Sequence, residues 1–194
     1  MRKIVSKLMI FGLISTLFMA CSTEDAQMNL NSLNASGSVV QTEAIAANDL
    51  VGTWLLYSMT SNTAVNFNPA TDQSSSFNIM DETSCFDNMY FTFRADGSVS
   101  TEQARLYFDE TGQFTCNSKI YPANYAVNGD QLQVSFDFNG TIATESKTIS
   151  LSQADGKEFL HVSLNKAETA AYVGDATGTV AEDITEVEMI YIKQ

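Results

Sequence analysis

Three cysteines carry the most distinctive chemistry in this 194-residue chain: Cys21, Cys85 and Cys116. A cysteine thiol can carry a lipid, form a disulfide, bind a metal or act as a nucleophile. The last two roles need partner residues, yet the chain has a single histidine, His161, and no C-x-x-C motif. The sequence therefore predicts no metal site, no cofactor and no catalytic thiol.

The first twenty residues predict export. Three basic residues precede an apolar run from Leu8 to Ala20. This run is shorter than the roughly 20 residues that a membrane-spanning helix needs. A positively charged N-terminal segment, a short apolar run and a final small residue are typical of a secretory signal peptide. Residues 1–20 are therefore expected to be a signal peptide.

The cysteine that follows this run resembles the lipobox cysteine of bacterial lipoproteins. In that pattern a small residue, here Ala20, precedes a cysteine whose thiol receives a diacylglycerol and whose freed amino group is acylated. The resemblance implies lipid attachment at Cys21, with acyl chains such as palmitate holding the protein in a membrane. Ser22 implies sorting to the bacterial outer membrane, either periplasmic or surface-exposed. The alternative is an ordinary signal peptide followed by an incidental cysteine.

Export would place Cys85 and Cys116 in an oxidising compartment. An even pair of cysteines in such a compartment is best interpreted as a disulfide. Closing a loop of about 32 residues would stabilise the fold by roughly 3.5 to 4 kcal/mol in the chain-entropy model. We therefore predict a disulfide between these two residues.

The charge balance excludes nucleic acid as a partner. Residues 1–20 hold three of the ten Lys and Arg residues and none of the 23 Asp and Glu residues, which leaves seven basic against 23 acidic residues after Ala20. Such a chain offers no basic surface to a phosphate backbone. Anionic lipid surfaces would also repel it, so we expect membrane contact through the N-terminal acyl chains alone.

The rest of the chain divides into a tether and one domain. Residues 21–48 are rich in Ser, Asn, Ala and Thr and lack aromatic residues, which is typical of a flexible linker. Residues 49–194 have a length that suits one domain. Strands are expected at eight segments of this domain: 52–59, 88–94, 98–108, 121–127, 131–138, 145–152, 158–164 and 186–193.

Turn signals and alternation favour hairpins between these strands. Asp96-Gly97, Asn139-Gly140 and Asp155-Gly156 favour turns with positive φ. Alternation places Met89, Phe91 and Phe93 on one face of their strand. Consecutive strands joined by tight turns form a meander, and eight of them commonly close. We expect an all-β fold, an eight-stranded antiparallel up-and-down barrel, with a two-sheet sandwich as the alternative.

The opening of the first expected strand resembles a known family. GTWLL, with Gly52 and Trp54, is similar to the Gly-x-Trp signature of lipocalins, and YFTFRADGSV and YAVNGDQLQVSF resemble small lipocalin-like domains of Gram-negative envelope lipoproteins. The resemblance implies a lipocalin-like barrel over residues 49–194, with an interior for a small apolar molecule and Trp54 packed across its closed end. The chain has no Thr-Asp-Tyr element, and Lys193 stands near the place of the final-strand arginine. An eight-stranded barrel filled by its own side chains is the alternative.

Two long connections interrupt the regular strands. Residues 61–87 form a long first loop, and long loops of this kind often act as lids. Residues 165–186 could hold a short helix or a further flap. The candidate lid contacts with a ligand are the apolar residues of the first loop: Phe67, Phe77, Ile79, Met80 and Phe86. The alternative is that they fill a satellite core beneath the loop.

No motif points to catalysis. The chain lacks a Gly-x-Ser-x-Gly elbow, a P-loop and a His-Glu-x-x-His motif, so we do not expect an enzyme. Two classes remain. The first is a membrane-anchored, lipocalin-like module that binds a small hydrophobic or amphipathic ligand in the cell envelope. The second is a solid barrel that acts as an interaction or inhibitor subunit of an envelope protein complex, and an interior pocket of a few hundred Å³ would favour the first.

Overall fold

The computed structural model describes residues 39–40, 44–67, 75–175 and 183–194. The expected signal peptide, Cys21 and most of the expected tether lie outside these residues. The statements about export and lipid attachment therefore stay predictions. Within the described residues, no helix combines the length and hydropathy that a membrane crossing would require.

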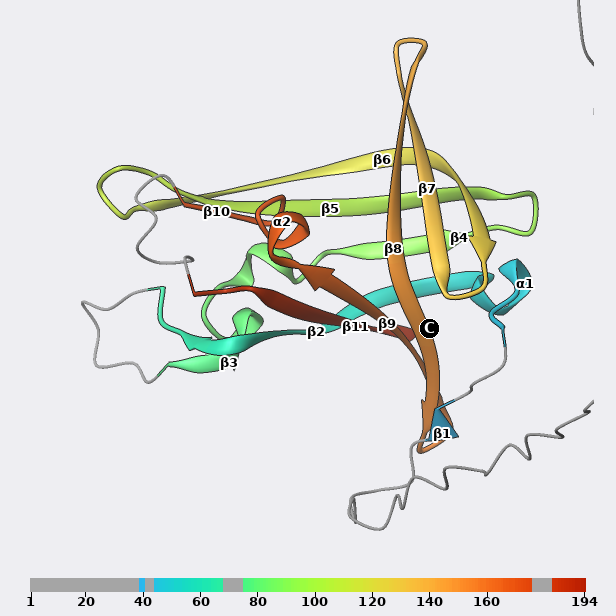
Figure 1. Cartoon of the computed structure of the whole chain (residues 1–194), viewed down its shortest axis with the longest axis horizontal. Coiled ribbons are helices and arrows are strands. Elements are labelled where there is room, and N and C mark those ends of the chain that lie inside the picture. The colour runs from blue at the N-terminus through green and yellow to red at the C-terminus, as the bar shows by residue number, and fades with distance from the viewer. Residues whose placement is uncertain (1–38, 41–43, 68–74, 176–182) are drawn as a thin grey trace, which may run out of the picture. The chain divides into compact units, whose positions relative to one another are not determined.

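Eight antiparallel strands form a closed barrel (Figure 1). Each strand pairs with its neighbours in chain order, and the last one closes the ring by pairing with the first. The eight strands are β2 (Gly52–Val65), β4 (Tyr90–Phe93), β5 (Ser98–Phe108), β6 (Phe114–Asn128), β7 (Gln131–Phe138), β8 (Thr141–Ala154), β9 (Lys157–Asn165) and β11 (Glu186–Lys193). The closed ring confirms the predicted all-β, eight-stranded up-and-down barrel rather than the two-sheet sandwich.

Several short elements lie outside the eight-stranded ring. They are β1 (Val39–Val40), paired with β8; α1 (Ala47–Leu50); β3 (Ser76–Asn78), paired with β2; the 3-10 turns η1 (Ile79–Asp81) and η2 (Ser84–Phe86); α2 (Lys166–Thr169); and β10 (Val173–Asp175), parallel to β5. The helix α2 lies within residues 165–186, where a short helix was one of the two expectations.

The first long loop is shorter than the sequence predicts. β2 continues to Val65, six residues beyond the expected strand end, and β3 pairs with this extension. Ser61, a polar residue that argues against a buried strand, is itself buried and lies within hydrogen-bonding distance of the carbonyl oxygens of Thr63 and Phe77. Because β3 follows sixteen residues later, local sequence could not predict this pairing.

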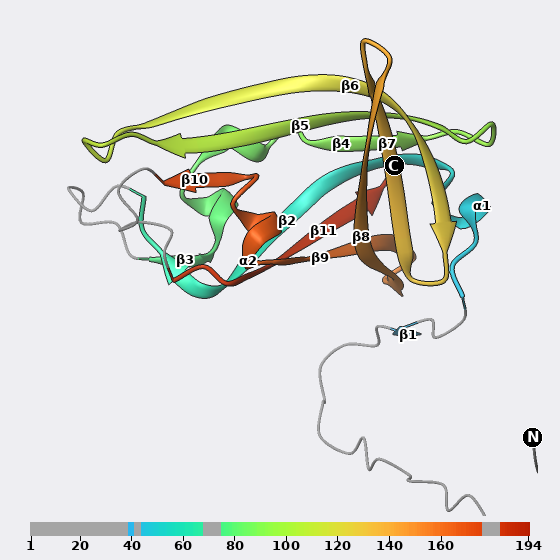
Figure 2. The same ribbon diagram turned by 45° about the horizontal axis from the view of Figure 1, so that its top comes forward.

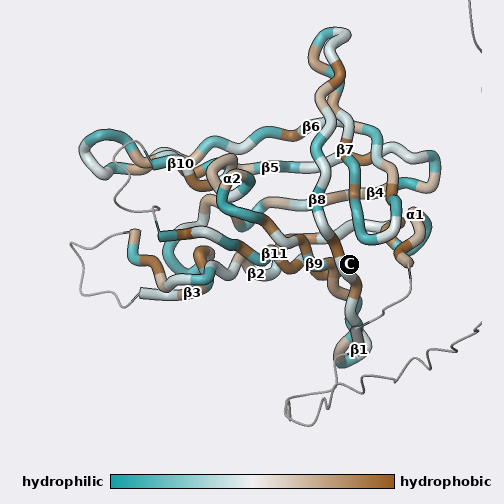
Figure 3. The backbone as a smooth tube through the Cα atoms, viewed as in Figure 1, coloured by the Kyte–Doolittle hydropathy of each residue, from teal (hydrophilic) through white to brown (hydrophobic). Residues whose placement is uncertain are grey.

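Alternation along the strands places the apolar side chains inside. Met89, Phe91 and Phe93 are all at most 9% exposed. Figure 3 shows hydrophobic and hydrophilic residues following one another along the barrel strands. The turns at Asn139 and Asp155 also have the predicted positive φ. Their φ values of 56° and 52° are the left-handed conformation of two-residue hairpin turns.

The Gly-x-Trp segment is held by the end of the last strand. Trp54 is completely buried, and its indole nitrogen donates a 2.6 Å hydrogen bond to the carbonyl oxygen of Leu50. The Lys193 ammonium lies 5.1 Å from the centre of the Trp54 ring. Gly52 has φ +135°, and a Cβ there would lie 3.1 Å from Cε of Lys193, so a side chain would be both strained and crowded. Trp54 and Gly52 thus have structural contacts within the barrel wall.

The predicted disulfide is present. Cys85 in η2 is bonded to Cys116 in β6. The bond fastens the end of the first long connection to the outer half of β6, which is one wall of the barrel.

Two hairpins extend past the closed part of the barrel (Figure 2). In the described chain, residues 114–122 of β6 pair with β5 alone, because β7 pairs with β6 only from Ala123 onward. Likewise, residues 141–147 of β8 pair with β7 alone, since β9 pairs with β8 from Thr148 onward. The β5–β6 and β7–β8 hairpins therefore separate from each other at one end of the barrel.

Candidate ligand cavity

A cavity of about 490 Å³ lies within the barrel and reaches the separating hairpins. Its lining side chains come from seven of the eight barrel strands and from the segment that follows α2. They are Phe91, Gln103, Ala104, Arg105, Asn117, Ser118, Lys119, Tyr121, Leu132, Val134, Phe136, Phe138, Glu145, Lys147, Val162, Ala171, Tyr172, Met189 and Tyr191.

The deep part of the cavity is apolar. Leu132 and Val134 of β7 alternate with the polar Gln133, so that the two apolar side chains face inward and are 1% and 5% exposed. Val162 of β9 and Met189 of β11 are equally buried and lie opposite each other in the strand register. These side chains can contact an apolar group but offer it no hydrogen bonds.

Three aromatic rings lie toward the outer end of the cavity. The Tyr121 ring lies 5.7 Å from the Phe136 ring and 6.3 Å from the Phe138 ring, and the two phenylalanines stack at 6.0 Å. Phe138 remains 48% exposed although it is a large apolar side chain. This aromatic group bridges the two hairpins where their strands separate.

The β5–β6 wall of the cavity is cationic. Arg105 lies opposite Asn117 and Gln103 lies opposite Lys119 in the antiparallel register, so all four side chains leave the same face of the hairpin. Arg105 contacts the ring of Tyr107 at 5.9 Å. Neither cation forms an ion pair with a carboxylate of the described residues.

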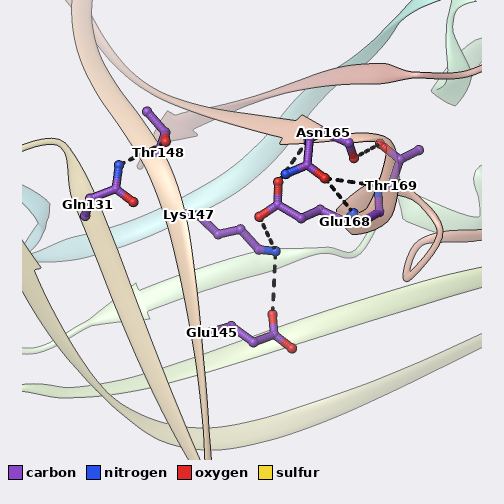
Figure 4. A network of polar contacts seen from close by, with 8 residues as sticks. Gln131, Glu145, Lys147, Thr148, Asn165, Glu168 and Thr169 are labelled. Atoms are coloured by element: carbon purple, nitrogen blue, oxygen red, sulfur yellow. Dashed lines mark hydrogen bonds and ion pairs between the residues drawn. The ribbon is translucent and has the colours of Figure 1, made fainter.

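The opposite wall carries a network of one ammonium and two carboxylates (Figure 4). The Lys147 ammonium of β8 lies 3.0 Å from Glu168 and 3.9 Å from Glu145. The Asn165 side chain caps α2 by accepting hydrogen bonds from the N–H groups of Ala167 and Glu168, and Glu168 accepts one from the Asn165 N–H. Burial works to raise the pKa of Glu168, but the Asn165 N–H and Lys147 outweigh it and lower that pKa.

Two phenols also line the cavity. Burial raises the pKa of Tyr191 well above its usual value, and Tyr172 adds to this effect. Burial likewise raises the pKa of Tyr172, with Glu145 and Glu168 contributing. Both phenols therefore stay protonated and can donate a hydrogen bond at neutral pH. Gln103 adds a buried side-chain oxygen that lacks a hydrogen-bond partner among the described residues.

The expected lid residues lie elsewhere. Phe67, Ile79 and Phe86 are at most 4% exposed and belong to the hydrophobic core, as the satellite-core alternative proposed, while Phe77 is 57% exposed. Met80 is partly buried against the same core, and none of the five lines the cavity. Phe67 packs instead on Phe108, 5.0 Å between ring centres, beneath the outer end of β5.

The cationic lining was missed because strand alternation was used only to find the apolar face. Gln103 and Arg105 follow Thr101 at two-residue intervals, and Thr101 is completely buried. Extending that face along β5 would have placed Arg105 on the cavity side, where it is exposed, because the buried positions change to the other face at Ala104, Leu106 and Phe108. The useful signal is a basic residue on the face that continues from Thr101 in a chain that is otherwise acidic.

One polar row outside the cavity has the composition of a catalytic triad. Ser152 Oγ lies 2.8 Å from Nε2 of His161, whose Nδ1 lies 2.9 Å from Glu188. The row crosses the outer face of β8, β9 and β11, because Leu160 and Val162 on either side of His161 point inward. At Ser152, β8 pairs with both β9 and β1, so the peptide groups of β8 are not available there to stabilise an oxyanion. We interpret the row as cross-strand polar pairing.

No group of three or more potential metal ligands occurs among the residues that the structure describes.

A family model matches this chain. Its description is a lipocalin-like domain, and the match covers residues 50–155, more than half of the chain. No curated protein and no solved structure matches the chain significantly.

Proposed function

We propose that this chain, which belongs to the lipocalin-like domain family, binds a small amphipathic molecule in the cavity of its barrel. The observation that carries the proposal is the cavity. Its volume of about 490 Å³ falls within the range of small-molecule sites, roughly 300 to 1,000 Å³. An apolar depth and a polar entrance suit a ligand with an apolar body and a polar end.

The same observation favours a ligand-binding module over a solid interaction subunit. A barrel whose side chains fill its interior would leave no space of this size. Members of this family are generally binding proteins without enzymatic activity. The proposal accordingly assigns no catalytic step to the chain.

We further propose that acyl chains on Cys21 hold the barrel at the outer membrane. This part is supported by the sequence around Ala20 and by residues 21–48, which as a flexible linker would span roughly 30 Å. Fractionation of the producing bacterium tests it. The chain should sediment with membranes and incorporate labelled palmitate, whereas Cys21→Ser should do neither and Thr23→Ala should behave as the wild type. Recovery of Cys21→Ser in the membrane fraction would refute the anchor.

Native mass spectrometry tests the ligand. The full chain carrying Cys21→Ser would be exported with its disulfide and purified without detergent. We expect a mass excess of small-molecule size that disappears on denaturation and is identifiable after organic extraction. A clean protein mass, both after purification and after exposure to a lipid extract of the host, would contradict the proposal.

A further inference from the structure

We propose that the outer half of β6, residues 114–122, binds an extended segment of a partner protein as an added antiparallel strand. The side chains of this segment alternate between acidic and apolar. In the described chain the outer half of β6 pairs with β5 alone, because β7 reaches β6 only at Ala123. Figure 2 shows the two hairpins separating there. Such an unpaired edge presents a row of main-chain hydrogen-bonding groups to another chain.

The hydrogen-bond pattern shows which peptide groups of this edge are free. The Tyr125 N–H donates to the carbonyl oxygen of Gly97 at 2.8 Å, one residue before the β5–β6 register begins. Ladder bonds of an antiparallel pair recur at every second residue, so the odd-numbered residues of β6 bond to β5. Even-numbered residues, such as Ser118 and Ile120, therefore direct their N–H and C=O groups to the free side. Pro122, which has no N–H, occupies the same alternation, as a proline on a sheet edge does.

One face of the edge is positively charged. β6 contains no Asp or Glu, and its one charged residue, Lys119, is exposed. The Lys119 ammonium lies 5.2 Å from the centre of the Tyr121 ring and forms no ion pair with a described carboxylate. Arg105 adds positive charge on the same face, although its head lies against Tyr107 and Gly174, on the far side of β5 from the edge. An acidic side chain opposite Lys119 would form a cross-strand pair of opposite charges.

The other face of the edge is apolar. Ile120 is 56% exposed and Phe114 is 41% exposed, although both side chains are large and apolar. They occupy even-numbered positions, the positions whose peptide groups are free. In an added antiparallel strand, the residues that hydrogen-bond to β6 would thus lie beside Ile120, and the residues between them would lie beside Lys119. Main-chain and side-chain requirements therefore favour the same alternating segment.

The edge is also held in place and differs from the second free edge of the barrel. The disulfide at Cys116 fastens β6 to η2, so that less conformational entropy is lost on binding. Residues 141–147 of β8 likewise pair with β7 alone in the part of the chain that the structure describes. That edge, however, is joined to α2 by the ion pair of Lys147 and Glu168. The proposal therefore concerns β6 and not β8.

Fluorescence anisotropy with synthetic peptides tests the side-chain requirement. The protein is the full chain carrying Cys21→Ser, at pH 7 and physiological salt. The probe is Thr-Val-Thr-Val-Glu-Val-Thr, with fluorescein at its N-terminus and an amide at its C-terminus. We expect it to bind about threefold more tightly than the same peptide with Gln in place of Glu. The peptide with Lys at that position should bind more weakly still, despite the negative charge of the whole protein.

Methylated peptides test the main-chain pairing. N-methylation of the two Val residues that flank Glu removes N–H groups that face β6, and it should weaken binding at least about tenfold. N-methylation of the Glu and of the inner Thr alters N–H groups that face away, and it should leave the affinity unchanged. Equal affinities of the two methylated peptides would overturn the added strand, as would a probe that does not bind measurably.

Variants locate the edge. Ser118→Pro removes one N–H from the free side of β6 and should weaken probe binding at least about tenfold. Ser146→Pro makes the same change on β8, where the N–H also faces away from the neighbouring strand, and it should bind as the wild type does. Lys119→Gln should abolish the preference for the Glu peptide over the Gln peptide, whereas Lys157→Gln in β9 should retain it. Circular dichroism melts would show that each variant is folded. An equal loss in the two proline variants would refute the site on β6.

Amide exchange measured by NMR distinguishes the possible occupants. In the free chain the N–H groups of Ser118 and Ile120 should exchange fast, whereas those of Asn117 and Lys119 should be protected by β5. The probe should slow the first pair. Slow exchange of the first pair in a monomer would mean that the chain covers its own edge. Slow exchange that appears only as a dimer forms, measured by ultracentrifugation, would assign the edge to a second copy. Either result would overturn the proposed partner.

Discussion

The Lys147 ammonium and the Glu168 carboxylate, 3.0 Å apart, join β8 to α2 beside the cavity. Their side chains are 15% and 24% exposed, so the pair is largely shielded from water. Glu168 also completes the capping box of α2 through Asn165. Because Tyr172 follows α2 and lines the cavity, this ion pair helps to fix one side of the site.

The pair makes stability depend on pH in a defined direction. The folded-state pKa of Glu168 is below its unfolded value, so its contribution is complete above the unfolded pKa, about 4.3, and is lost as the pH falls further. Gln can still cap the helix, so Glu168→Gln removes mainly the charge. We expect a loss of about 1 kcal/mol in the free energy of unfolding at pH 7.

Urea unfolding at pH 7 and pH 3.5 measures this effect. The difference between the wild type and Glu168→Gln should largely disappear at the lower pH. Glu110→Gln, in an exposed turn, serves as the control and should match the wild type at both values. An unchanged difference at pH 3.5 would show that the ion pair is not its cause.

The disulfide should be a major contributor to stability. Cys85 and Cys116 are 31 residues apart, and the chain-entropy model predicts that cross-linking a loop of this size stabilises the fold by about 3.5 to 4 kcal/mol. Replacing both residues with Ala should lower the free energy of unfolding by this amount, measured in urea. Reduction of the wild type should give a matching loss. A change below about 1 kcal/mol would mean that the loop end is held by other contacts.

The Ser152–His161–Glu188 row should have no hydrolytic role. A fluorophosphonate, which labels activated serines, should leave Ser152 unmodified in intact-mass measurements. His161→Ala should cost less than about 1 kcal/mol of stability, as removal of an exposed polar pair does. Stoichiometric labelling of Ser152 that vanishes in His161→Ala would contradict this prediction and show that Ser152 is an activated nucleophile on the outer face of the barrel.

The strands were predictable because their signals are local. Alternation and two-residue turns occur within a few residues of one another, and all eight expected segments lie on barrel strands. The positive φ values of Asn139 and Asp155 follow from the same short-range chemistry. The Cys85–Cys116 pair was predictable because only two cysteines remained once Cys21 was assigned to the anchor.

The site was less predictable because it depends on contacts distant in sequence. Phe67 was expected over a ligand but packs on Phe108, about forty residues later, which no local pattern encodes. The entrance exists because β6 and β8 extend beyond their pairing with β7 and β9, and alternation alone does not reveal where a strand loses a neighbour. Arg105 lines the cavity at this point.

Filling the cavity tests the central claim most directly. Val134 faces the buried part of the cavity, whereas its neighbour Gln133 is exposed on the other face of β7. Val134→Trp should occupy the apolar space, and Gln133→Trp adds the same side chain outside. Dodecanoate binding would be measured for both by titration calorimetry, with a thermal melt to verify folding. The account predicts at least a tenfold loss for Val134→Trp and none for Gln133→Trp; equal affinities in folded variants would contradict it.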